Sequence, residues 1–381
     1  MIQVTPETIE RTCTRNGSFY VPDRVKAAIE GCLINDDENA VTTEYLRLLA
    51  EFQTYEKLMI PAHIDYCANG ELTLKAYTAY YLSRYMFIPS VALRDLVLHP
   101  FFQNVPDSFR VLDLGSGTGA VVLGLLSLFS TSPLSRVAIN ITALDRCAEA
   151  LNMQKSLIEK AGFNSKRVHH YKEDLCDIDS CIKLAKKEGP YYLIFLANCL
   201  TELEPDVAIN LVRRLPEILA DNGAIIIAEA QRDYIKTLVR TLATKAESLG
   251  LHVYYPCPAT GCPCTSLPEC WVWRDHEYKF PPIRVSGQPL QERPKEKFPL
   301  SWLILTRQNV SIYDVFAEKR PDLRWGPLSF FGSDSKNYDS QVCTSSGIIN
   351  RLRIGKSIKR GSLVGGMGEP FRIDLDSPYE L

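Results

Sequence analysis

Apolar side chains recur at intervals of three and four residues through the first hundred positions of the chain. Three stretches carry this spacing, namely SFYVPDRVKAAIEGCL, TTEYLRLLAEFQTYEKLM and LTLKAYTAYYLSRYMF. Because such spacing places apolar groups on one side of a helix, residues 1–100 are predicted to form an N-terminal helical region. Tyr77, Tyr80, Tyr81 and Tyr85 share the spacing, and they face either the core, the commoner role of such a stripe, or a substrate.

From about residue 108 the pattern changes to short apolar runs that alternate with amphipathic helical segments. The runs are RVLDLGSG, VAINITALD, YYLIFLANC and GAIIIAEA, and strands that alternate with helices are typical of a parallel sheet. The predicted fold class is therefore α/β, with a Rossmann-like sheet over residues 101–310. LHVYYP and LSWLILTRQN are predicted to pair as its last strands.

The remaining segments differ in composition from this sheet. A Cys-rich insertion, residues 254–299, separates the last two predicted strands, and its proline-rich end, residues 281–299, is predicted to be an extended loop. Residues 311–381 alternate like strands and contain glycines, so a β-rich C-terminal segment is expected.

Composition and charge exclude several classes of protein. With 46% hydrophobic residues, 23% charged residues and a net charge of −2, the 381-residue chain is globular, and its bulk charge gives no reason to expect nucleic acid binding. Its longest apolar runs are too short to span a membrane. The start of the chain, MIQVTPETIERTCTRNG, lacks the apolar segment of a signal peptide and carries acidic residues that transit peptides avoid. A cytoplasmic location without membrane contact is therefore expected.

A glycine-rich turn follows the first predicted strand of the sheet. In VLDLGSGTGAVVLGLL, the strand leads to Gly115, Gly117 and Gly119, and an apolar helix follows. Alternate glycines let the backbone turn tightly and approach a ligand, while the helix start presents free N–H groups. A ligand site is predicted here; the alternative is a Rossmann-like sheet whose turn has lost its ligand.

Acidic residues end the strands near this turn. Asp113 precedes the glycines, Asp145 ends the next strand where it can accept hydrogen bonds from ribose hydroxyls, and Asp174 follows a third strand where it can bond an adenine amine. The turn is G-x-G-x-G rather than the dinucleotide pattern G-x-G-x-x-G. Residues 108–250 therefore resemble class I S-adenosylmethionine-dependent methyltransferases. The resemblance implies that Asp113 and the glycines line the methionine side, Asp145 the ribose and Asp174 the adenine.

The segment ANCLTELEP follows the fourth strand, where such enzymes place residues that meet the acceptor. Asn198 and Glu202 are candidates to position an acceptor, although either can equally be a local cap. Cys199 is either a nucleophile, as in pyrimidine C5 methylation, or a small buried thiol at a strand end. The N-P-P-Y signature of amino-group methyltransferases is absent.

Cysteines gather in the insertion. Because no secretory signal is expected, the thiols should be reduced, and a cluster of them indicates a metal before a disulfide. Cys257, Cys262, Cys264 and Cys270 lie in a Pro- and Gly-rich loop, and Cys343 lies far downstream. Four thiolates suit either tetrahedral zinc or a cubane iron–sulfur cluster. Unconnected free cysteines are the alternative.

Several of these motifs together resemble one family. AYTAYYLSRY, NCLTELEP, the cysteine loop, EKFPLSWLIL and VCTSSG are similar to the methyltransferase-like family that associates with the mitochondrial small ribosomal subunit and has prokaryotic relatives. The resemblance covers roughly residues 75–360. It implies a 4Fe–4S cluster held by Cys257, Cys262, Cys270 and Cys343, with Cys264 as the alternative to Cys262.

The same resemblance implies a ribosomal partner. INRLRIGKSIKRGS gathers Arg351, Arg353, Lys356, Lys359 and Arg360 into a local basic stretch that is either an RNA contact or simply solvated. The predicted function is a methyltransferase acting on or with the small ribosomal subunit, with rRNA or a ribosomal protein as acceptor. The alternative is a non-catalytic assembly or translation factor that binds S-adenosylmethionine and a 4Fe–4S or zinc site.

Overall fold

The structure is a computed structural model of the chain. It describes residues 18–62, 70–97, 108–131, 134–230, 232–256 and 297–319, together with positions 9, 12, 14–15, 64, 66, 99, 273–277, 283–286, 288–289, 324–331, 338–343, 349–354, 363–367 and 372–373. Beyond residue 319 and in residues 273–277 the description is of the backbone alone.

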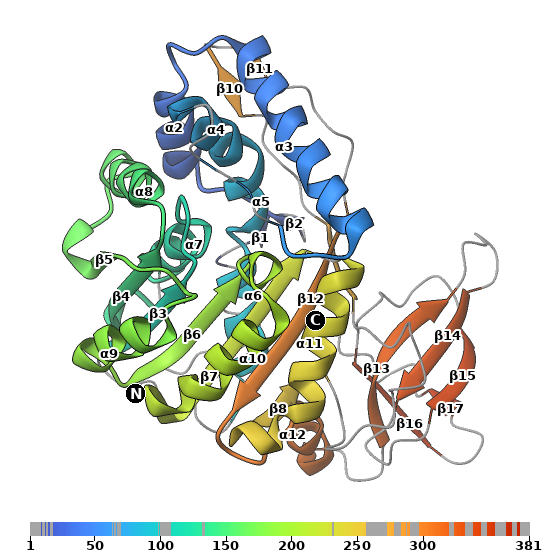
Figure 1. Cartoon of the computed structure of the whole chain (residues 1–381). Helices are drawn as coiled ribbons and strands as arrows, with labels where there is room; N and C mark the ends of the chain where they lie inside the picture. The colour runs from blue at the N-terminus through green and yellow to red at the C-terminus, as the bar shows by residue number, and fades with distance from the viewer. Residues whose placement is uncertain are drawn as a thin grey trace.

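A twisted sheet forms the centre of the molecule (Figure 1). Its strands are β3 (Ser108–Leu114), β4 (Ala138–Asp145), β5 (Val168–Lys172), β6 (Tyr191–Ala197), β7 (Leu219–Ala230), β8 (His252–Tyr255) and β12 (Lys297–Thr306). They lie in the order β5-β4-β3-β6-β7-β12-β8, and β9 (Trp273–Glu277) pairs with one end of β12. The strands from β5 to β7 are parallel, whereas β12 runs antiparallel to both β7 and β8. The predicted pairing of LHVYYP with LSWLILTRQN is therefore confirmed.

Helices cover both faces of this sheet. They are α7 (Ala120–Leu128), α8 (Ala148–Lys160), α9 (Ile178–Glu188), α10 (Pro205–Arg214) and α11 (Asp233–Lys245). Successive strand residues point to opposite faces, so Val111 and Phe195 join one core while Leu112 and Ile194 join the other. The predicted α/β, Rossmann-like fold is confirmed.

The first hundred residues are mainly helical, as the apolar spacing predicted. The elements are α2 (Asp23–Cys32), α3 (Glu38–Leu58), α4 (Glu71–Tyr77), the π-helix η1 (Thr78–Leu82), α5 (Ser83–Tyr85) and α6 (Ile88–Leu96). A small hairpin of β1 (Thr14–Arg15) and β2 (Ser18–Phe19) precedes them. The first helix was predicted too early, because Pro22 caps α2 and the residues before it are extended.

Close packing joins the helical region to the sheet. A Cβ atom at Gly124 in α7 would lie 2.3 Å from the backbone oxygen of Met86, which lies between α5 and α6, so only glycine allows this segment and α7 to approach this closely. Figure 1 shows the N-terminal helices beyond the end of the sheet at which the arrows of β6 and β7 point. The helical region therefore lies beside the carboxyl ends of the strands, where ligands bind in open α/β sheets.

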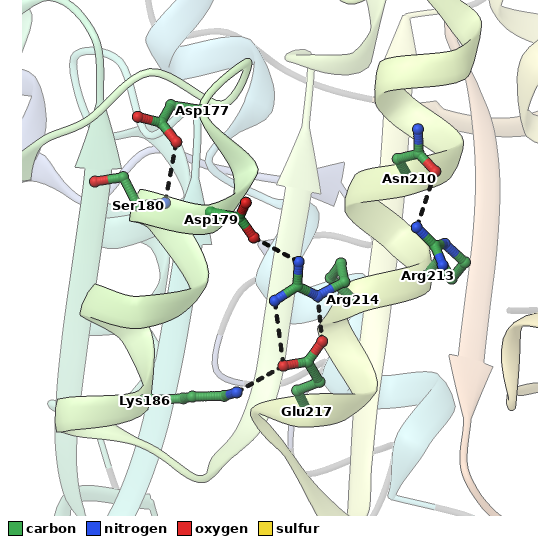
Figure 2. Close-up of polar contacts among 8 residues, drawn as sticks. All are labelled: Asp177, Asp179, Ser180, Lys186, Asn210, Arg213, Arg214 and Glu217. Atoms are coloured by element: carbon green, nitrogen blue, oxygen red, sulfur yellow. Dashed lines mark hydrogen bonds and ion pairs between the residues drawn. The ribbon is translucent and has the colours of Figure 1, made fainter.

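An ion-pair network ties α9 to α10 and to the 3₁₀ turn η6 (Leu215–Glu217), as Figure 2 shows. Arg214 donates to Asp179 at 2.7 Å and also contacts Glu217, which accepts from Lys186 at 2.6 Å. Hydrogen bonds from Arg214 and Lys186 lower the pKa of Glu217 to about 2. Because these side chains are largely in contact with water, the network orients the helices more than it stabilises the fold.

The C-terminal segment forms a second sheet, consistent with the predicted β-rich tail. After α12 (Ile312–Lys319) come β13 (Arg324–Phe331), β14 (Tyr338–Cys343), β15 (Ile349–Ile354), β16 (Leu363–Met367) and β17 (Arg372–Ile373), in the order β15-β14-β13-β16-β17. The extended loop predicted for residues 281–299 is partly wrong, because β10 (Arg284–Val285) and β11 (Gln288–Pro289) form a hairpin and β12 begins within it. No helix in the described part of the chain has the length and apolarity that crossing a bilayer requires.

Candidate cofactor site

The glycine turn joins β3 to α7 in a conformation that requires glycine. Gly115, Gly117 and Gly119 have φ angles of 68°, 52° and 97°, in the left-handed region. A Cβ atom at Gly115 would lie 2.4 Å from the Cβ of Cys199, and one at Gly119 would lie 2.6 Å from Gln154. At Gly117 a Cβ atom would meet nothing within 4 Å. Two of the glycines are therefore packed, and the middle one borders open space.

Asp145 fixes this turn from the end of β4. Its Oδ2 accepts the backbone N–H of Gly117 at 2.7 Å, and its Oδ1 accepts that of Cys147 at 2.8 Å. Burial raises the pKa of Asp145, and these two hydrogen bonds oppose the shift. A carboxylate has about four acceptor positions, so Asp145 retains acceptor capacity for ribose hydroxyls.

Asp113 is almost completely buried beside the turn, with 1% of its surface exposed. Its Oδ2 has no hydrogen-bond partner among the described residues, and burial raises the pKa of its carboxyl well above the usual value. Buried polar atoms nearly always have partners. The open oxygen therefore favours a ligand group at this position, as the sequence predicted.

Asp174 lies at the outer part of the site. Its side chain is exposed and accepts the backbone N–H of Cys176 at 2.9 Å. It lines the same cleft as Gly117 and Asp145. The structure thus brings it near the predicted ribose residue, and its role toward adenine stays a prediction.

Asn198 and Cys199 follow β6 and have structural contacts. Asn198 has a φ angle of 55°, and its Oδ1 accepts the backbone N–H of Ala230 at 2.9 Å, which makes it a local cap between β6 and β7. The Cys199 thiol is buried, and burial raises its pKa well above the usual value. Because nucleophilic cysteines need a lowered pKa, these contacts favour the buried-thiol interpretation of Cys199.

Glu202 lies at the centre of a polar group that joins three parts of the chain. Its Oε1 accepts the Tyr66 hydroxyl at 2.5 Å, and its Oε2 accepts a guanidinium N–H of Arg146 at 2.9 Å. Arg146 also donates to the backbone oxygen of Ile64 at 3.4 Å. Burial raises the pKa of Glu202 to about 7, against the opposing effects of Tyr66 and Arg146. The carboxyl therefore titrates near neutral pH.

Sequence reasoning missed Tyr66, Arg146 and Glu229. Glu229 is fully buried in β7 and accepts the backbone N–H groups of Cys199 and Leu200, each at 2.9 Å. Burial raises its pKa to about 8. The acidic residue inside the apolar run GAIIIAEA could have indicated that Glu229 is buried and holds backbone N–H groups. By contrast, nothing in the sequence near Tyr66 indicated that its hydroxyl bonds Glu202.

One cleft collects these residues at the carboxyl ends of β3, β4 and β6. One part of it is lined by Tyr66, Tyr77, Gly117, Asp145, Arg146, Asp174, Asn198 and Glu202, and an adjoining part by Tyr77, Tyr81, Tyr85, Asp113, Gly117, Gly119 and Asn198. Tyr80 instead stacks on Tyr45, with ring centroids 3.7 Å apart, as a core residue. Of the four tyrosines, Tyr77, Tyr81 and Tyr85 therefore line the cleft, and Tyr80 packs in the core. The backbone turn and carboxylates of the cleft fit a nucleoside with an amino-acid side chain.

Sequence comparison shows what this part of the chain is similar to. Residues 83–271 match the family described as "Methyltransferase domain". This span is therefore similar to methyltransferase domains. The match supports S-adenosylmethionine as the ligand of the cleft, and the sheet is that of a Rossmann-like class I methyltransferase. No curated protein matches the chain.

Solved methyltransferases resemble the chain distantly. The mitomycin 7-O-methyltransferase has 14% identity and a TM-score of 0.39, over 68% of this chain and 61% of that one. An O-methyltransferase family protein from Burkholderia thailandensis has 13% identity and a TM-score of 0.41, over 72% and 73%. Magnesium protoporphyrin IX methyltransferase from Synechocystis, with bound S-adenosylmethionine, has 11% identity and a TM-score of 0.33, over 60% and 85%. The chain spans about three fifths of the mitomycin enzyme.

The predicted metal ligands are cysteines whose side chains the structure does not describe. Cys257, Cys262, Cys264 and Cys270 fall outside the described residues, and Cys343 is the last residue of β14. Within the described part of the chain, no group of three or more His, Cys, Asp or Glu side chains has a metal-binding arrangement. The cluster and zinc alternatives therefore stay predictions.

The predicted basic stretch is described only in part. Arg351 and Arg353 lie in β15, whereas Lys356, Lys359 and Arg360 fall outside the described residues. RNA contact through this stretch stays a prediction.

Proposed function

We propose that the methyltransferase domain transfers a methyl group from S-adenosylmethionine to a component of the small ribosomal subunit, either rRNA or a ribosomal protein. The observation that carries the methyltransferase part is Asp113, a buried carboxyl with an open oxygen beside the glycine turn. The ribosomal part rests on the family resemblance of AYTAYYLSRY, NCLTELEP and the cysteine loop.

In this proposal some residues of the cleft bind the cofactor and another accepts a proton from the acceptor. S-adenosylmethionine, when bound, supplies a methyl group on a positively charged sulfur. Gly117, Asp113 and Asp145 would hold it through backbone and carboxylate contacts. An acceptor N–H or O–H that gains the methyl group must lose a proton. Glu202, with a pKa near 7, is the base that would take this proton.

Two neighbours orient that base. Tyr66 and Arg146 each bond one oxygen of the Glu202 carboxylate, so its plane is fixed relative to the cleft. Arg146 follows Asp145 directly, which links the position of the base to that of the predicted ribose ligand. Positioning of this kind is worth more to methyl transfer than the strength of the base alone.

One observation favours the alternative of a non-catalytic assembly or translation factor. Both oxygens of Glu202 and the Oδ1 of Asn198 already have protein partners. An acceptor group must displace or share these bonds. In this alternative the bound S-adenosylmethionine and the metal site serve structural or sensing roles at the small subunit.

A 4Fe–4S cluster is the second part of the proposal. Its ligands would be Cys257, Cys270 and Cys343 with either Cys262 or Cys264, and zinc is the alternative metal. Thiolate binding couples to folding, so the cluster would tie the insertion to β14. Iron, acid-labile sulfide and zinc per chain, measured in anaerobically purified wild type and Cys270→Ser, test this. About four irons that the variant loses support the cluster, while zinc alone or no metal contradicts it.

Labelled methyl transfer separates the enzyme from the factor. Immature and mature small subunits are incubated with methyl-labelled S-adenosylmethionine and wild type, Asp113→Ala, Glu202→Gln or the exposed-site control Glu247→Gln. Label in the rRNA or protein fraction that both cleft variants abolish, and the control retains, supports the enzyme. Subunit binding that survives Asp113→Ala, without transfer, supports the factor. A wild type that neither binds nor labels the subunit contradicts the ribosomal part.

A further inference from the structure

Gln154 is a polar side chain that lies buried against the glycine turn. It belongs to α8, and 0% of its surface is exposed. The other buried residues of that helix are apolar, namely Ala150, Leu151, Leu157 and Ile158. Because a buried amide needs hydrogen-bond partners, the atoms that Gln154 contacts indicate why this helix carries a polar residue on its buried face.

The Gln154 amide bonds two consecutive residues of the turn. Its Nε2 donates to the Oγ of Ser116 at 2.5 Å and to the backbone oxygen of Gly117 at 3.3 Å. Its Oε1 has no hydrogen-bond partner among the described residues. Exchange of the two amide atoms would place an acceptor against the Gly117 oxygen, which is itself an acceptor. The turn therefore uses Gln154 as a donor.

Gly119 makes room for this side chain. A Cβ atom at Gly119 would lie 2.6 Å from the Cγ of Gln154 and 2.9 Å from its Nε2. Any larger residue at this position would push the amide away from the turn. The glycine at position 119 therefore permits the contact between Gln154 and the turn, in addition to allowing the positive φ angle.

Gly117 is held at both its N–H and its carbonyl oxygen. The N–H donates to Asp145 at 2.7 Å, and the oxygen accepts from Gln154. Asp145 ends β4 and Gln154 lies on the helix that follows, so one β4–α8 unit supplies both partners. Gly117 borders the open space of the cleft. Since an unrestrained glycine can adopt many conformations, these two bonds determine which one a ligand meets.

We infer that Gln154 is a positioning residue, which holds the Ser116 hydroxyl and the Gly117 oxygen and so fixes the glycine turn in the conformation that binds the cofactor. The inference rests on S-adenosylmethionine being the ligand of the proposed function. Gln154 is not among the described residues that line the cleft, so it acts through the turn. Without its two bonds the turn adopts several conformations, and the affinity falls in proportion to the fraction that can bind.

Calorimetric titration of the full chain with S-adenosylmethionine measures this effect without any methyl transfer. Gln154→Met keeps the length of the side chain and fills the space beside Gly119, but it donates no hydrogen bond. Its affinity should be about three- to tenfold lower than that of the wild type. Ile158→Ala is the control, because it shortens a fully buried side chain one helical turn further along α8. It should lower the thermal stability and leave the affinity unchanged.

Gln154→Glu adds a pH readout that loss of packing does not produce. An ionised carboxylate cannot donate to the Gly117 oxygen, whereas a protonated one donates one hydrogen bond. The affinity relative to the wild type should therefore fall as the pH rises through the pKa of the introduced carboxyl, between about pH 5 and 9 for a buried glutamate. The same ratio for Gln154→Met should stay constant. The wild type at each pH is the reference, because all variants share the acids that line the cleft, namely Asp113, Asp145, Asp174 and Glu202.

Thermal unfolding of each variant checks that it folds. If Gln154→Met does not fold, Gln154→Asn takes its place, because its amide is one methylene shorter and cannot reach both partners. An unchanged affinity in the methionine variant, an equal fall in Ile158→Ala, or a constant ratio in Gln154→Glu overturns the positioning role and leaves the proposed function intact. A wild type that does not bind S-adenosylmethionine overturns both.

Discussion

The hydroxyl of Tyr66 lies 2.5 Å from a carboxylate oxygen of Glu202, 136 positions further along the chain. A backbone hydrogen bond of 2.8 Å from Ala62 to Thr201 lies beside it. Together they join the segment between α3 and α4 to the loop after β6. The N-terminal region is therefore a wall of the cleft.

Removal of the Tyr66 hydroxyl tests how much the contact between Tyr66 and Glu202 stabilises the fold. A hydrogen bond to a charged group contributes about 1.5–3 kcal/mol, so Tyr66→Phe should lower the free energy of unfolding by about that much in urea denaturation. Tyr171→Phe is the matched control, because the Tyr171 hydroxyl bonds Glu188 at 2.9 Å near the surface. Its loss should be smaller. Equal losses would contradict a special role for the cleft contact.

Glu202 makes stability depend on pH. Burial raises its pKa to about 7 from an ordinary value of 4.5, so between these values the folded chain keeps a proton that the unfolded chain has released. The stabilisation is complete below pH 4.5 and is lost as the pH rises through 7. Glu202→Gln cannot titrate, so the free energy of unfolding should fall less across this window, by up to about 3 kcal/mol.

Urea denaturation at several pH values checks the Glu202 prediction. The pKa of Glu229 is also raised, to about 8, and this residue stays in the variant. The slope of stability against pH should therefore be reduced in Glu202→Gln and not abolished. Parallel curves for wild type and variant would show that Glu202 titrates at its ordinary pKa.

Asp113→Asn should change stability and cofactor binding in opposite directions. The variant replaces a buried carboxyl whose Oδ2 has no partner among the described residues, so thermal stability without ligand should stay equal or rise. Affinity for S-adenosylmethionine should fall at least about tenfold, because the acceptor facing the ligand is lost. Asp145→Asn should differ, because the Asp145 carboxylate accepts two backbone N–H groups. This variant should therefore have both a lower thermal stability and a lower affinity for S-adenosylmethionine. Calorimetry and thermal unfolding of both variants decide this.

Alanine variants of two glycines in the turn distinguish the cost of overpacking from the cost of backbone strain. Gly115 and Gly117 both have positive φ angles, yet only at Gly115 would a Cβ atom collide with Cys199. Strain of about 1–2 kcal/mol applies to either alanine variant, and overpacking adds about 1–3 kcal/mol at Gly115 alone. Urea denaturation should therefore find Gly115→Ala the less stable. If Gly117→Ala is destabilised as much, the Cys199 contact is not what fixes Gly115.

Sequence patterns of short range were sufficient to predict much of the fold. The apolar runs that became β3, β4, β6 and β7 are long, buried on both faces and separated by amphipathic helices, so period and length identified them. The glycine turn was equally visible, because its conformation is a local property of the backbone. By contrast, the start of α2 and the β10–β11 hairpin escaped, since short elements carry little periodic signal.

The sequence by itself determined the sheet, the turn and the carboxylates that end its strands, because each depends on residues close together in the chain. Only the tertiary structure decided which side chains meet across the cleft. Tyr66, Arg146 and Glu202 come from three distant segments, and no local pattern encodes their contact. The tertiary structure likewise decided that Tyr77, Tyr81 and Tyr85 line the cleft while Tyr80 stacks on Tyr45, a choice that helical spacing alone leaves open.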